Sequence, residues 1–263
     1  MSRLNEAQEA ARRRPIYHRT FAGLESAFRR IEKHVPNPIE TTHGRRLVYR
    51  YSEQTIEAAI FLKFARVVSL TRGVLLLLDA GHVQEQCILQ RSIEETNEDI
   101  LFLCLAITQQ KFTEKHEDFL REFWKENYAD PDDPVGSRVP RAFSRRGIRS
   151  FINRALGQDN PSLADVTSRS VYEMYSGFLH GAAPHIVELF DERRGHFLLD
   201  GISSQERFID YILDAQNSLY RTLLSAAIVT KAFGLLEELA FIQSVIDQFT
   251  KEIGIDWLHP AES

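Results

Sequence analysis

Three polar residues recur at four-residue steps in the segment VYEMYSGFLHG, residues 171–181, namely Tyr172, Ser176 and His180. Residues four apart lie on one face of an α-helix, so these side chains would form one polar stripe. A histidine in such a stripe can serve as a general acid or base, because its pKa lies near neutrality. The spacing therefore makes His180 the first candidate for chemistry.

The same stripe has a purely structural explanation. Gly181 and Pro184 follow His180, which is typical of a helix C-terminus, where the helix dipole favours a histidine. An unbroken helix also leaves Ser176 without free backbone N–H groups to stabilise an oxyanion, which argues against a serine hydrolase. Arg169 extends the polar face as a candidate ligand-binding residue. The pattern indicates a polar face without identifying a reaction.

A second set of ionisable residues shares one side of the helix predicted for residues 80–109. Apolar residues, Cys87 and Phe102 among them, bracket this set along the same side of the helix. We expect these charges to be covered and paired, because an unpaired buried charge is costly. Tyr172 and His180 are the candidate distant partners. The members of the set are Arg91, Glu94, Glu95 and Glu98.

Arginines dominate the stretch SRVPRAFSRRGIRSFINR, residues 137–154, which contains no acidic residue. Arg141, Arg145 and Arg149 would share one helix face, and a basic face with aromatic neighbours can bind phosphate or RNA. The alternative is that these arginines are solvated or paired within the protein, with the acidic run DPDD just upstream as a source of carboxylates.

A metal site would draw on His180, His185 and Glu188, together with Glu94 or Glu95 across the bundle. Dinuclear carboxylate bundles require Glu-x-x-His pairs on two helices, and none of the predicted helices contains such a pair. We therefore expect neither a metal ion nor a cofactor.

The elements that must position these residues are predicted from apolar periodicity, which is helical along most of the chain. Prolines and aspartates at 127–140 predict a loop. The predicted helices span residues 4–34, 53–78, 80–109, 112–128, 141–156, 162–180, 204–232 and 235–253.

Long helices with short connections predict an all-α fold, an antiparallel helical bundle forming one domain. Short extended segments at 45–51 and 195–201 would add a β-hairpin or edge strands. We expect residues 1–50 to be an N-terminal helical appendage, 51–253 the bundle and 254–263 a tail.

The composition narrows the class of protein. The chain has 263 residues, 43% hydrophobic and 26% charged, as soluble globular domains do. Its two cysteines lie in apolar helical pattern, which indicates free thiols in a reducing compartment. The leucine-rich apolar run GVLLLL, residues 73–78, is too short to span a membrane. We expect a cytoplasmic protein without a membrane partner, and the net charge of −5 argues against a globally basic nucleic-acid binder.

Two segments resemble the DUF5677 family of bacterial helical proteins of unknown function. They are LLDAGHVQEQCILQRSIEETNEDILFL at 77–103 and VYEMYSGFLHGAAPHIVELFD at 171–191, followed by GHFLLDG. The resemblance covers roughly two thirds of the chain and implies an all-helical fold. The family motifs would map onto Arg91, Ser92, Glu94 or Glu95, Tyr172, Ser176 and His180.

DUF5677 proteins look similar to the wider HEPN group, which includes metal-independent ribonucleases of toxin and phage-defence systems. The signature of those enzymes is an arginine followed by four to six residues and a histidine. His180 lacks it, because the nearest upstream arginine is Arg169. Matches elsewhere in the chain are no more frequent than chance predicts.

Three functions therefore stay open. In the first, the chain is a binding or regulatory protein of bacterial stress or phage defence, with a polar pocket for a nucleotide or RNA. In the second, it is a ribonuclease with His180 as acid or base and Arg91 steadying a phosphate. In the third, the polar residues form a structural layer without a ligand. We also expect a homodimer formed through an apolar helix face. The pocket residues are Arg91, Glu95, Tyr172, Ser176 and His180.

Overall fold

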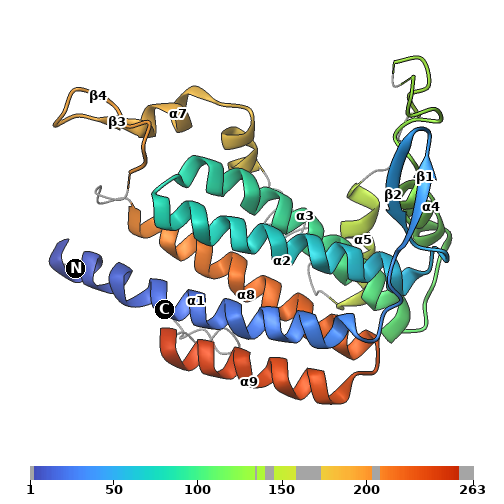
Figure 1. Cartoon of the computed structure of the whole chain (residues 1–263). Coiled ribbons are helices and arrows are strands. Elements are labelled where there is room, and N and C mark those ends of the chain that lie inside the picture. The colour runs from blue at the N-terminus through green and yellow to red at the C-terminus, as the bar shows by residue number, and fades with distance from the viewer. Residues whose placement is uncertain (1–2, 134, 140–144, 158–172, 203–207, 255–263) are drawn as a thin grey trace.

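The computed structural model describes residues 3–133, 135–139, 145–157, 173–202 and 208–254, which form an all-α bundle with two short hairpins (Figure 1). This architecture confirms the predicted fold class. No helix within the described residues is both long and apolar enough to cross a membrane.

Five long helices build the body of the bundle and lie side by side in Figure 1. They are α1 (Arg3–Glu32), α2 (Ile56–Ala80), α3 (Val83–Thr108), α8 (Phe208–Ala232) and α9 (Leu236–Ile253). Two shorter helices, α4 (Glu114–Trp124) and α5 (Arg145–Ala155), lie at the end of the bundle where α3 finishes (Figure 1).

The opposite end carries shorter elements. Residues 173–179 are helical and are followed by α7 (Ala183–Ile186) and the 3-10 turn η1 (Val187–Leu189). A small antiparallel hairpin, β3 (Phe190–Asp191) with β4 (His196–Phe197), projects beyond them (Figure 1).

The connection between α2 and α3 follows from its sequence. Thr55 caps the start of α2 by accepting a hydrogen bond from the N–H of Ala58 at 3.1 Å. Gly81 ends the helix in the left-handed conformation, with φ of +79°, which a residue without a side chain adopts at no steric cost. Since α3 begins two residues later, at Val83, the two helices must run antiparallel as neighbours.

A single core joins the helices, and α1 is part of it. Tyr17 and Leu24 of α1 are fully buried, in one apolar cluster with Phe64 of α2, Ile93 of α3 and Leu219 of α8. The sequence analysis separates residues 1–50 as an appendage. In the structure, the α1 helix is integral to the core.

The predicted extended segments are found as hairpins. The segment predicted at 45–51 becomes β2 (Arg46–Arg50), which pairs antiparallel with β1 (Ile39–His43), a strand that the sequence analysis missed. The segment predicted at 195–201 is shorter than expected, since only His196–Phe197 pairs with β3.

The bounds of two predicted helices, 112–128 and 162–180, can be compared with the structure. α4 ends at Trp124 rather than at residue 128, because Lys125 takes an extended conformation and the chain turns back through a bridge between Tyr128 and Arg138. Of the helix predicted at 162–180, residues 173–179 are described and helical. The predicted tail lies almost wholly outside the described residues.

Candidate functional site

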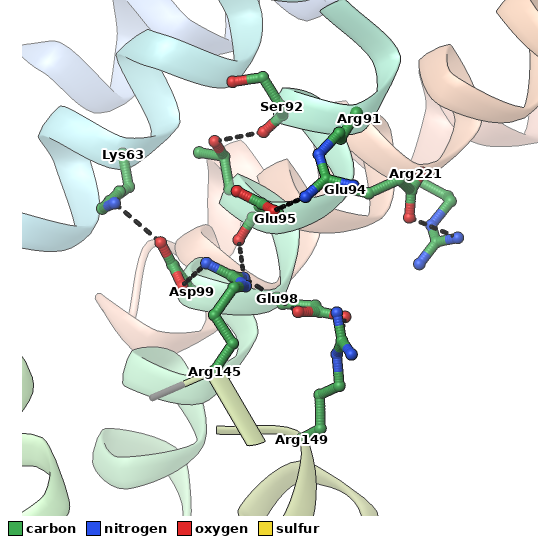
Figure 2. A network of polar contacts seen from close by, with 11 residues as sticks. Lys63, Arg91, Ser92, Glu94, Glu95, Glu98, Asp99, Arg145, Arg149 and Arg221 are labelled. Atoms are coloured by element: carbon green, nitrogen blue, oxygen red, sulfur yellow. Dashed lines mark hydrogen bonds and ion pairs between the residues drawn. The ribbon is translucent and has the colours of Figure 1, made fainter. Parts of the chain in front are cut away.

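Four carboxylates on α3 form the centre of the candidate site, and we call them the α3 acidic cluster. Each lies within ion-pair distance of a cation, and the cations come from α2, α3, α5 and α8 (Figure 2). The charged side of α3 is therefore paired within the protein, as the sequence analysis expects. The cluster consists of Glu94, Glu95, Glu98 and Asp99.

Glu98 holds α5 against the bundle. Its Oε2 lies 2.9 Å from Nη2 of Arg145, and its Oε1 lies 3.0 Å from Nε of Arg149. These two arginines are four residues apart, so they project from one face of α5 and reach the same carboxylate (Figure 2). Arg145 also donates from Nη2 to the backbone carbonyl of Glu95 at 2.7 Å.

Asp99 is the most buried member of the cluster, with 4% of its surface exposed. It lies between two cations, since Oδ2 is 2.7 Å from Nζ of Lys63 and Oδ1 is 3.2 Å from Nη1 of Arg145. Nζ of Lys63 also lies over the rings of Phe119 and Phe123, 5.6 and 5.1 Å from their centroids. Burial lowers the pKa of Arg145, but the facing carboxylates of Asp99 and Glu98 outweigh that effect and raise it.

Glu94 faces the opposite helix. Its Oε2 lies 2.7 Å from Nη1 of Arg221 on α8. Burial raises the pKa of Glu94 to about 7, although Arg221 opposes this shift and Glu98 reinforces it. The carboxyl group therefore exchanges its proton near neutral pH.

Arg91 and Glu95 form a pair within α3, with 3.3 Å between Nη2 and Oε1. Only 11% of the Arg91 side chain is exposed. This pair was expected from the helical spacing.

Two sets of predicted residues turn out to be one. The spacing in the sequence predicts one candidate site with Arg91, Glu94 and Glu95. It predicts a separate basic patch with Arg145 and Arg149. The structure joins both sets through the α3 acidic cluster (Figure 2).

In the described part of the chain, the acidic run DPDD forms no ion pair with Arg145 or Arg149, which pair with Glu98 and Asp99. Asp130 and Asp133 instead accept hydrogen bonds from backbone N–H groups of their own turn, those of Asp132 and Gly136, each at 2.9 Å. Asp132 faces Arg45, with 3.8 Å between Oδ2 and Nε. The prediction that these arginines pair internally holds for Arg145 and Arg149, through other carboxylates.

His180 is not joined to the cluster. The helix ends at residue 179, and Gly181 adopts a φ of +62°, which confirms that it caps the helix C-terminus. His180 is exposed, and within the described residues its side chain forms no hydrogen bond or ion pair. Ser176 is half-buried on the same helix. The predicted site residues Arg141, Arg169 and Tyr172 lie outside the described residues.

The neighbouring histidine, His185, contacts other groups. Its ring lies 4.1 Å from that of Phe178, and its Nδ1 is 3.9 Å from Oε1 of Glu188, which also accepts a hydrogen bond from Tyr211. The backbone carbonyl of His185 accepts from the Gln84 amide. Within the described part of the chain, no group of three or more His, Cys, Asp or Glu side chains is arranged to hold a metal ion.

Hydrogen bonds between helices also cross the core. The hydroxyls of Thr71 on α2 and Thr222 on α8 lie 2.9 Å apart, and Ser225 on α8 donates to Oδ1 of Asn97 on α3 at 2.7 Å. These contacts fix the register of α2, α3 and α8.

Sequence reasoning missed Lys63, Asp99 and Arg221. Lys63 and Arg221 each lie in a long, largely apolar helix, where a cation flanked by apolar residues can indicate a buried ion pair. Asp99 follows Glu95 by four residues, which places it beside the charged face.

No family model matches the chain, and neither curated proteins nor solved structures provide a significant match. The functional interpretation therefore rests on the geometry of the site.

Proposed function

We propose that this chain is a helical binding protein for a nucleotide or an RNA, in which the α3 acidic cluster holds α5 in place. The observation that carries the proposal is the contact of one carboxylate, Glu98, with both Arg145 and Arg149 of α5. Paired and partly covered charges of this kind fix the position of a helix rather than react. The basic helix α5 then forms part of a preorganised binding surface.

Binding is favoured over catalysis by the position of His180. A catalytic histidine is normally oriented by a second side chain, and within the described residues His180 has no such partner. Arg91, the proposed phosphate-steadying residue of a ribonuclease, is paired with Glu95. Within the described residues, no hydrogen bond or ion pair joins the His180 side chain to either of these two residues.

The cellular setting is part of the same proposal. The setting that we propose is bacterial stress or phage defence in the cytoplasm, which is the setting implied by the likeness of DUF5677 proteins to the wider HEPN group. Self-association through an apolar helix face belongs to the same proposal.

The test uses the purified chain, a labelled single-stranded oligoribonucleotide and mononucleotides. We expect fluorescence anisotropy to show saturable binding and gel electrophoresis to show intact RNA. Cleavage of the RNA would support the ribonuclease alternative, and absence of binding to any of these ligands would overturn the proposal.

A pair of variants tests the role of the cluster. We expect Glu98→Gln to weaken binding, because α5 loses the carboxylate that holds both of its arginines. Asp118→Asn is the matched control, since Asp118 pairs with Arg121 at 2.8 Å on an exposed face of α4. Equal binding by both variants would show that the cluster does not position the binding surface.

A further inference from the structure

A surface pocket of about 330 Å³ lies where the first turn of α4 meets the last turns of α5. Lys111, Lys115 and Arg154 line it together with the apolar groups of Phe151 and Ala155. Its volume falls at the lower end of the range for small-molecule sites. The pocket lies beyond the α3 acidic cluster, at the end of the bundle that carries α4 and α5 in Figure 1.

The three cations of the pocket are exposed, and none of them forms an ion pair with a described residue. Within the described residues, no acidic oxygen lies within the 4.0 Å of an ion pair from Lys111, Lys115 or Arg154. Arg154 donates only from Nε to the carbonyl of Ser150, at 3.0 Å, in its own helix. This arrangement differs from that of Arg149, five residues earlier in α5, which is paired with a glutamate. The positive charge of the pocket is therefore available to a ligand.

Two further features set the local electrostatics. Glu114 also lines the pocket, and its negative charge offsets part of the positive charge of the two lysines and the arginine. The net charge of these lining side chains is still positive. The pocket includes the N-terminus of α4, whose backbone N–H groups and dipole favour an anion. The C-terminus of α5 would oppose an anion, but the carbonyl of Ala155 accepts a hydrogen bond from Nε2 of Gln109 at 3.0 Å.

The floor of the pocket is rigid and apolar. The ring of Phe151 packs edge-on against Phe102 and His116, with centroids 5.2 and 4.7 Å away. His116 is fully buried, and its Nδ1 accepts a hydrogen bond from the N–H of Thr113 at 3.1 Å. Burial lowers the pKa of His116, so its ring adds no charge beneath the pocket.

We infer that this pocket binds a nucleoside monophosphate group, either free or at the 5′ end of an RNA. Lys111, Lys115 and Arg154 hold the phosphate, and the nucleoside lies against Phe151 and Ala155. The inference rests on the proposed function and assigns its ligand a place and a chemical class. It also explains why α5 must be held firmly, since α5 supplies Arg154 and the floor.

The test titrates the full chain with adenosine 5′-monophosphate and with adenosine by calorimetry. We expect the monophosphate to bind at least about tenfold more tightly than adenosine, because charge-assisted hydrogen bonds hold the phosphate. Lys115→Ala and Arg154→Ala should each weaken binding of the monophosphate about tenfold. Lys251→Ala, which removes an exposed cation from α9, is the control and should leave binding unchanged.

A variant that removes a negative charge from the pocket gives a second, opposite test. Glu114→Gln should strengthen binding of adenosine 5′-monophosphate several-fold, because it removes a negative charge that lines the pocket. A residue with only a structural role would not produce this gain. All these side chains are exposed, so circular dichroism should show unchanged folding.

Oligoribonucleotides with a 5′-phosphate or a 5′-hydroxyl distinguish a free nucleotide from an RNA end. Tighter binding of the 5′-phosphorylated strand assigns the pocket to RNA ends, and preference for the mononucleotide assigns it to free nucleotides. If the wild-type chain binds these ligands but the pocket variants bind equally well, the inference fails and the proposed function stands. If no nucleotide or RNA binds at all, the proposed function fails too.

Discussion

Glu94 on α3 lies 2.7 Å from Arg221 on α8, yet the pKa of its carboxyl group is raised to about 7. The exposed pair formed by Glu9 and Arg12 behaves in the opposite way, since the Arg12 guanidinium lowers the pKa of Glu9 to about 2. The difference arises from burial, which disfavours the ionised carboxylate of Glu94 by more than one arginine can offset.

The first prediction concerns stability as a function of pH. In the unfolded chain Glu94 has a pKa near 4.5, so between about pH 4.5 and pH 7 the folded state binds the proton and the unfolded state does not. The free energy of unfolding should therefore fall as pH rises through this window, by up to about 1.4 kcal/mol per pH unit. Glu94→Gln should remove this contribution.

Urea unfolding between about pH 4 and pH 8 measures the effect as a difference between wild type and variant. Asp214→Asn is the control, because burial raises the pKa of Asp214 from 3.8 to about 6 and places its own contribution at lower pH. Parallel stability curves for wild type and Glu94→Gln would show that Glu94 titrates as an ordinary carboxylate.

The second prediction concerns the attachment of α5. Glu98→Gln should destabilise the fold by about 1–3 kcal/mol, because Arg145 and Arg149 remain partly covered without their shared carboxylate. Hydrogen exchange should accelerate most in the amides of α5. Asp118→Asn breaks an exposed pair and should change stability by less than about 1 kcal/mol. Unchanged exchange in α5 would mean that its apolar face alone holds it.

The third prediction concerns the loop that docks on the turn between α2 and α3. Gly201 has a φ of +104°, and a Cβ there would lie 2.5 Å from the carbonyl oxygen of Ala80. Gly201→Ala should therefore destabilise the fold by about 2–4 kcal/mol, because backbone atoms must move. Gly195 also has a positive φ, +69°, but its Cβ would meet nothing within 4 Å. Gly195→Ala should cost about 1 kcal/mol, and equal losses in thermal unfolding would contradict the steric explanation.

Much of the fold follows from periodicity, because burial of one helix face imposes a repeat that the chain shows directly. The long helices are confirmed on this basis, and so is the cap at Gly181. The pairing between elements does not follow. The partners of Glu94 and Asp99 come from helices far away in the sequence, and only the packing of α2, α5 and α8 on α3 brings them together. For His180 the spacing in the sequence suggests a role in chemistry, but the side chain is exposed.

The last prediction concerns Gly177, the first of the two glycines in the segment YSGFLHG, residues 175–181. A Cβ at Gly177 would overlap Nε2 of His185, whose ring packs over this position beside Phe178. Gly177→Ala should thus destabilise the docking of α7 by about 1–3 kcal/mol, in spite of the better helix propensity of alanine. His185→Ala should lose less, since it removes one ring contact at a half-buried position.

The double variant Gly177→Ala with His185→Ala separates this steric effect from a backbone effect. If the overlap with the imidazole is the cause, the double variant should be more stable than Gly177→Ala alone, and urea unfolding of all four proteins closes the cycle. Purely additive losses would instead mean that Gly177 is required for a reason other than His185. Gly177 would then be required by the helix itself, and its contact with the His185 ring would not determine the stability.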